Sequence, residues 1–217
     1  HELKMKNRSV PILELCLDDS SLDLCVGRRL DKELVDPKVL ELLQPPNLPV
    51  LFFPAIDDEK DVYSLSEAKK IITEKLPQES GGGKVIIVAL DATWKFGKEM
   101  HRANLKDDLY PTNLIRVSLQ PSDFPENWVS GRFNIRTTPK KGDSTLGFMS
   151  TVECIAWAAS ELERGSNNNN NSNKPDLFAT LMKPLDLMVA KWNAFVKQPK
   201  LRKPKASRKR SRDEKES

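Results

Sequence analysis

Apolar residues are distributed along this chain in two patterns, as short continuous or alternating runs and as longer stretches with helical spacing. The short runs, bounded by Pro, Gly or charged residues, predict strands at 21–28, 49–54, 84–90 and 113–119. The helical spacing predicts amphipathic helices at 31–43, 64–76, 93–102, 151–163 and 176–196. The segment 10–17 fits a strand or a short helix.

Local signals refine this pattern. Ser64 and Glu67 have the spacing of a capping box. Pro184, near the middle of the last helix, predicts a kink or two shorter helices. The run Gly81–Lys84 precedes a strand, whereas a phosphate-binding loop follows one, so we expect a flexible connection. The Asn-rich tract near 166–174 is expected to be a disordered insertion. Alternating strands and helices predict an α/β fold with a mostly parallel sheet flanked by helices.

The stretch 84–100 is the first place to look for chemistry. Its apolar run Val85–Leu90 predicts a buried strand, which ends abruptly at Asp91, and Thr93 and Trp94 follow where helical spacing begins. In open α/β sheets, ligands bind at the carboxyl ends of the strands. Asp91 therefore has two interpretations of equal weight: a partly desolvated general base, or the cap of the following helix.

Charge separates the chain into two parts. The 217 residues, 38% of them hydrophobic, can form one sizeable core, which we place in a single domain at 1–199. Between Lys197 and Ser217 there are ten Lys or Arg and three Asp or Glu, so the other residues hold 25 basic and 28 acidic side chains, a net charge of −3. The basic segment 200–217 is expected to be a disordered tail that serves as a nuclear localisation signal, an RNA-binding arm or a solubilising end.

Composition excludes several classes of protein. Cys16, Cys25 and Cys154 fit neither a disulfide framework nor paired zinc ligands, which favours a reduced, intracellular protein. Apolar runs are too short to span a membrane, and a signal peptide is not evident. The chain begins with His1 rather than Met, so we expect a fragment of a longer protein.

Other candidate residues have a functional and a structural interpretation. Trp94 stacks on a base or belongs to the core, and His101, without a partner at ligand spacing, is expected on the solvated surface. Ser150 and Glu153 fit a capping box. A cluster of cations suits a phosphate-facing loop as well as a solvated surface: Arg132, Arg136, Lys140 and Lys141. These residues alone indicate a ligand-binding α/β domain with a basic surface.

Three motifs in order resemble the DTW-domain family, the tRNA-uridine aminocarboxypropyltransferases. The first is an Asp-x-Thr-Trp turn followed by a Met, the second an Arg before a basic loop with Pro, and the third a Ser-Thr-x-Glu helix start. They are represented here by Asp91, Thr93, Trp94 and Met100, by Arg136 and Pro139, and by Ser150, Thr151 and Glu153. The strand Leu51–Pro54 and the basic opening segment with Arg8 are also similar to the family, whose Cys-rich segment, with a possible zinc site, is expected upstream.

The resemblance implies a fold related to the knotted SPOUT methyltransferases, with a C-terminal knot. It implies transfer of the 3-amino-3-carboxypropyl group of S-adenosylmethionine to N3 of a tRNA uridine, with release of 5′-methylthioadenosine and without a metal. Asp91 is the expected catalytic residue, as a general base or an electrostatic partner of the cofactor. The expected cofactor-binding residues are Phe53, Pro54, Leu90, Asp91, Thr93, Trp94, Ser150, Thr151 and Glu153. The expected RNA-binding residues are Arg8, Arg102, Arg132, Arg136, Lys140 and Lys141.

Two other functions are compatible with these residues. One is RNA methylation by a SPOUT-type enzyme, and the other is RNA binding without catalysis, which the basic tail favours. We expect the protein in the nucleus, the cytoplasm or both.

Overall fold

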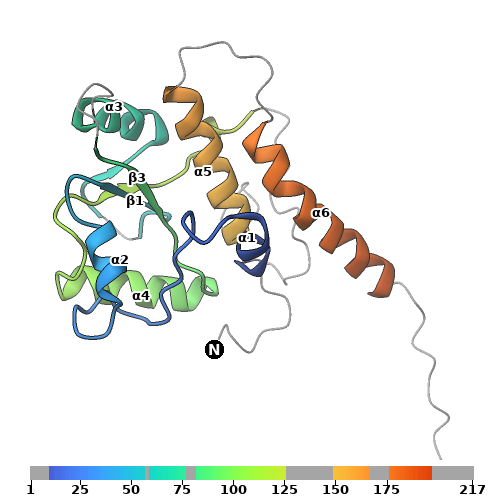
Figure 1. Cartoon of the computed structure of the whole chain (residues 1–217), viewed down its shortest axis with the longest axis horizontal. Coiled ribbons are helices and arrows are strands. Elements are labelled where there is room, and N and C mark those ends of the chain that lie inside the picture. The colour runs from blue at the N-terminus through green and yellow to red at the C-terminus, as the bar shows by residue number, and fades with distance from the viewer. Residues whose placement is uncertain (1–9, 57–58, 77–81, 126–148, 167–175, 197–217) are drawn as a thin grey trace, which may run out of the picture.

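The computed structural model describes residues 10–56, 59–76, 82–125, 149–166 and 176–196. Its centre is a four-stranded sheet in the order β2-β4-β1-β3 (Figure 1). The strands are β1 (Leu48–Phe52), β2 (Val62–Tyr63), β3 (Val85–Val88) and β4 (Ile115–Val117). Every strand pair is parallel, so the predicted α/β fold with a parallel sheet is confirmed. The knot and the SPOUT-like relationship stay predictions.

Strand β1 occupies the interior of the sheet. Val50 pairs with Ile87 of β3 on one side and with Ile115 of β4 on the other. Every residue of β1 is buried, as its continuous apolar sequence requires when both faces of a sheet are covered. β3 is an edge strand, and its residues are only half-buried. The prediction that 84–90 forms a buried strand is therefore wrong, because β3 has a neighbouring strand on one side only within the described residues.

Helices cover both faces of the sheet. Helices α3 (Leu65–Lys75) and α5 (Thr151–Ser166) share a core with inward-facing residues of the strands, and α2 (Pro37–Leu42) and α4 (Trp94–Lys106) lie on the other side in Figure 1. The predicted capping box of α3 is confirmed: the Ser64 amide donates to Glu67 Oε2 (2.8 Å), and the Glu67 amide donates to Ser64 Oγ (3.3 Å).

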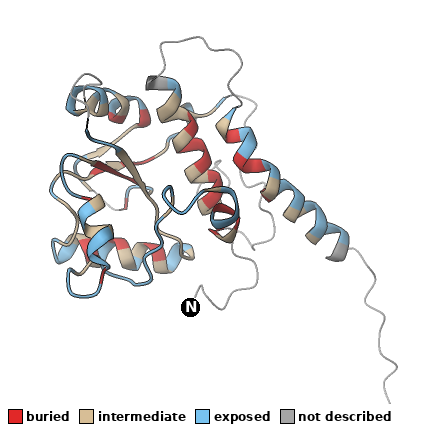
Figure 2. Cartoon of the chain, viewed as in Figure 1, coloured by how far each residue is buried: buried red, intermediate tan, exposed pale blue. Residues whose placement is uncertain are grey.

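A second core joins three helices beside the sheet. In it α5 packs against α1 (Val10–Cys16) and α6 (Leu177–Val196), with the Trp157 ring against Phe124 and Phe178. Helix α5 is thus covered on the sheet side and on the α6 side, which explains its buried centre in Figure 2. Leu185 is fully buried, and burial of such a side chain contributes about 1.5–3 kcal/mol.

Several sequence predictions need correction. The segment 21–28 is not a strand, since it pairs with none of the described strands, and Leu24 and Val26 are 50% and 76% exposed. In the part of the chain that the structure describes, its alternating pattern lacks the neighbouring strand that would hold it. The helix expected at 31–43 begins only at Pro37, which lacks an amide hydrogen and fits the first turn, after the N-cap Asp36.

Other predictions are resolved in detail. The ambiguous segment 10–17 forms helix α1, and α6 is one helix with Pro184 inside it, so the alternative of two shorter helices is wrong. The Asn-rich tract, residues 126–148 and the basic tail lie outside the described residues. None of the helices in the described part is long and apolar enough to cross a membrane.

Candidate functional site

Asp91 lies beyond the carboxyl end of β3, as the sequence predicts. The Ala92 amide donates to the Leu90 carbonyl oxygen (3.1 Å), which closes a tight turn under Asp91. The N-cap of α4 is Thr93, with extended backbone angles, and the α4 amide of Gly97 donates to the Thr93 carbonyl (2.8 Å). Asp91 is therefore not the cap of this helix, and its carboxylate faces another element.

That element is the amino terminus of α5. The Thr151 hydroxyl donates to Asp91 Oδ1 (2.8 Å), which joins two segments 60 residues apart. The helix start is fixed by a capping box: the Ser150 amide donates to Glu153 Oε2 (2.7 Å), and the Glu153 amide donates to Ser150 Oγ (3.2 Å). The predicted capping box is confirmed, and Glu153 is only 1% exposed. The positive end of the α5 dipole stabilises a carboxylate at this position.

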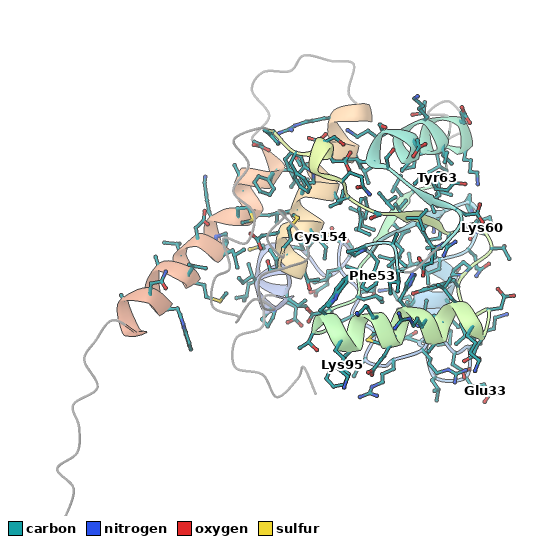
Figure 3. All side chains as sticks on the ribbon, turned by 180° about the vertical axis from the view of Figure 1, so that it is seen from behind. Glu33, Phe53, Lys60, Tyr63, Lys95 and Cys154 are labelled. Carbon is teal, nitrogen blue, oxygen red and sulfur yellow. The ribbon has the colours of Figure 1, made fainter. Side chains whose placement is uncertain are left out.

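Phe53 contributes an aromatic wall beside the same turn. It follows β1 directly, and its amide donates to the Val117 carbonyl (3.0 Å). Its ring stacks on that of Trp94, with centroids 5.7 Å apart, and Figure 3 shows it between the sheet and α4. A Cβ atom at Gly97 would lie 3.2 Å from the Phe53 ring, so the absence of a side chain there lets the ring approach α4. Trp94 is 38% exposed and forms the rim of the site.

His101 is not on the surface, and this prediction is wrong. The side chain is 2% exposed, under the Phe53 ring (centroids 4.9 Å apart). Its Nδ1 atom lies 2.9 Å from the Tyr110 hydroxyl, and Nε2 lies 3.2 Å from a Glu59 carboxylate oxygen. Sequence spacing did not reveal this burial, because the partners come from other segments of the chain. Within the described residues, no group of three or more His, Cys, Asp or Glu side chains could hold a metal ion.

The buried imidazole makes the protein sensitive to acid. Burial lowers the pKa of His101 from its ordinary value of 6.5, with Glu59 opposing this shift and Arg116 adding to it, and burial raises the pKa of the neighbouring Tyr110 phenol. The unfolded chain therefore takes up a proton before the folded one does. We expect the free energy of unfolding to fall as the pH decreases below about 6.5 and to level off below the lowered folded pKa.

Urea denaturation between about pH 8 and pH 5 measures this effect. The matched variant is His101→Gln, which should lose that part of the pH dependence. An identical pH profile for the two proteins would contradict this assignment to His101.

Of the cationic residues expected to bind RNA, only Arg102 lies in the part of the chain that the structure describes. Arg8, Arg132, Arg136, Lys140 and Lys141 lie outside the described residues, whereas Arg102 is exposed on α4. Three lysines lie on the same side of α4 as Arg102, at intervals of three or four residues: Lys95, Lys98 and Lys106. These three are not among the RNA-binding residues expected from the sequence. The helical spacing of these cations in the sequence could have indicated them. Lys98 lies over the Trp94 ring, 5.3 Å from its centroid, at the rim of the site.

A hollow of about 330 Å³ lies elsewhere, between α3 and the strands β2 and β4. It is lined in part by Asp61, Lys75 and Thr112. Asp61 precedes β2 and Thr112 precedes β4, so this hollow lies toward the amino ends of the strands, whereas ligands of α/β sheets bind at the carboxyl ends. We therefore place the candidate site at Asp91.

Contacts bring Phe53, Asp91, Trp94 and Thr151 together from three segments, whereas no hydrogen bond or ring contact joins Pro54 or Leu90 to another of these segments within the described residues. Phe53 and Pro54 come from the end of β1, residues 90–94 from the turn after β3, and residues 150–153 from the start of α5. Two contacts connect these segments, Phe53 with Trp94 and Asp91 with Thr151. The result is a carboxylate, two helix amino termini and an aromatic wall in one place. Such a set can bind a ligand with an aromatic part and charged groups of both signs.

Comparisons with known proteins agree with the motifs. The family model described as DTW domain matches residues 1–193. No curated protein and no solved structure matches the chain. Since the match covers most of the chain, the protein belongs to the DTW-domain family, the family of tRNA aminocarboxypropyltransferases, whose members modify tRNA.

Proposed function

We propose that this protein transfers the 3-amino-3-carboxypropyl group of S-adenosylmethionine to N3 of a uridine in tRNA and releases 5′-methylthioadenosine. The observation that carries this proposal is the hydrogen bond from Thr151 to Asp91. It brings the first and third motifs of the family together at the carboxyl edge of a parallel sheet, where ligands of α/β folds bind.

The residues of the site suit S-adenosylmethionine. Asp91 offers a carboxylate to the ammonium or the sulfonium of the cofactor, and the amino termini of α4 and α5 suit its carboxylate. The half-exposed Trp94, backed by Phe53, offers an apolar surface to the adenine. The cofactor supplies a γ-carbon that is activated toward a nucleophile because it is bonded to a positively charged sulfur.

Asp91 also suits the role of the base. Its Oδ1 accepts the hydrogen bond from Thr151, and among the described residues no donor is bonded to Oδ2. Oδ2 is therefore available to take the N3 proton of the uridine while N3 bonds to the γ-carbon and the bond from that carbon to sulfur breaks. Transfer of a proton to a positioned carboxylate accelerates such a step by about 10²–10⁴-fold.

The cationic side of α4 suits a tRNA substrate. Its cations, Lys95, Lys98, Arg102 and Lys106, follow the helix away from Trp94, within residues 1–196, whose 25 basic and 28 acidic side chains give a net charge of −3. Contacts of Lys and Arg with phosphates release counterions, so affinity for tRNA should fall steeply with added salt. This surface leads a nucleic acid toward the turn that holds Asp91.

Mass spectrometry of tRNA incubated with the protein and S-adenosylmethionine tests the proposal. The expected product is a uridine that carries the aminocarboxypropyl mass, together with an equal amount of methylthioadenosine. Gain of a methyl mass with S-adenosylhomocysteine would instead identify a methyltransferase. Binding of tRNA without any product or cofactor affinity would indicate a noncatalytic RNA-binding protein.

A further inference from the structure

Helix α4 presents three positions to one aromatic ring. Trp94, Gly97 and His101 follow one another at intervals of three and four residues and therefore lie on one side of the helix. All three contact Phe53: Trp94 stacks on its ring, Gly97 leaves room for it, and His101 lies against it at a tilt of 45°. The Phe53 side chain thus packs against two turns of α4, with Trp94 at the exposed end of this contact and His101 at the buried end.

The imidazole of His101 is itself fixed from both sides. Tyr110, from the segment that follows α4, meets Nδ1 at 2.9 Å, and Glu59, from the connection between β1 and β2, meets Nε2 at 3.2 Å. Because both ring nitrogens have partners, the ring cannot turn without breaking one of these contacts. A buried polar group that loses its partner costs about 1–3 kcal/mol, so the orientation of the ring is strongly held.

The partners of His101 are anchored in turn. Arg116 of β4 approaches the Glu59 carboxylate (3.9 Å), and its guanidinium donates to the Lys60 carbonyl oxygen (2.6 Å). Glu59 and Lys60 are therefore tied to the sheet by Arg116, and Glu59 is tied to α4 by His101. Through direct ring contact, His101 acts on the position of Phe53.

We propose that His101 is a positioning residue, which holds the Phe53 ring against Trp94 and thereby sets the shape of the aromatic wall of the cofactor pocket. This inference rests on the proposed function for the identity of the ligand. A Phe53 ring that is free to change rotamer has to be ordered when the ligand binds, and ordering a side chain lowers affinity. His101 removes that cost before the ligand arrives.

Calorimetry with S-adenosylmethionine tests the inference in His101→Gln and in the milder Tyr110→Phe. For His101→Gln we expect a dissociation constant about tenfold higher, equivalent to about 1.4 kcal/mol, with a smaller rise for Tyr110→Phe. Turnover at saturating cofactor should change by less than about threefold, since the reacting groups are intact. The matched control is Leu185→Val, which trims a buried side chain in the α5–α6 core and should leave cofactor affinity unchanged.

Unchanged cofactor affinity in His101→Gln, or an equal loss in Leu185→Val, would overturn the inference. Absence of cofactor binding by the wild-type protein would instead contradict the proposed function. The contact itself is then tested by urea denaturation of His101→Gln, Phe53→Leu and the double variant. Non-additive shifts of the midpoint support the positioning of Phe53 by His101, and additive shifts contradict it.

Discussion

Replacement of Asp91 by asparagine is expected to reduce turnover by about 10²–10⁴-fold while the protein stays folded. Asparagine keeps the size of the side chain and an oxygen that accepts the hydrogen bond from Thr151, but it cannot take the N3 proton. Formation of methylthioadenosine in a single turnover, at saturating cofactor and tRNA, measures the effect. Turnover at the wild-type rate would rule out Asp91 as the base.

Comparison of cofactor affinity with turnover in the Asp91 variant separates the possible roles of Asp91. A variant that binds S-adenosylmethionine normally but turns over slowly has lost a base, whereas one whose affinity falls has lost an electrostatic partner of the cofactor.

Thr151→Val removes the hydroxyl that orients Asp91, and Thr151→Ser retains it. We expect a clear loss of turnover in the first and near wild-type turnover in the second.

Replacement of Glu153 by alanine is expected to lower the free energy of unfolding by about 1–3 kcal/mol. The change removes the carboxylate that accepts from the Ser150 amide, at a buried position, and leaves this donor without its partner. The first turn of α5 should loosen as a result, and Thr151 with it, so turnover should fall as well. Urea denaturation and the same single-turnover assay measure the two effects.

Glu153→Gln is the matched control, because glutamine also fits the last position of a capping box. The decrease in the free energy of unfolding should be less than half of the decrease caused by Glu153→Ala. If glutamine proves as damaging as alanine, the charge of Glu153 matters more than its hydrogen bond to Ser150.

Much of the sheet could be predicted from the sequence, because its strands are set by local signals. The run at 49–54 is apolar and bounded by Pro, and it becomes the interior strand β1. The alternation of strands with helical segments gives the parallel arrangement. The order of the strands could not be predicted, since it depends on contacts between segments far apart in the chain. For this reason the half-buried edge position of β3 was missed.

The candidate site shows the same division. The motifs named Asp91 and Thr151, and the structure brings them within a hydrogen bond of each other. His101 was misplaced because an isolated histidine in an amphipathic helix gives no indication of its distant partners, Glu59 and Tyr110. Its burial is a property of the assembled fold, and spacing along one helix does not encode it.

The contact between Thr151 and Asp91 also has a consequence for the order of folding. The strands and α4 come from the part of the chain before residue 118. The partner of Asp91 is Thr151 of α5, which lies 60 residues after Asp91 in the sequence. Contacts between such distant segments carry a high entropic cost of loop closure and form late. During synthesis on the ribosome, the sheet can therefore pair before α5 emerges, and the hydrogen bond of the candidate site between Thr151 and Asp91 forms only when that helix docks.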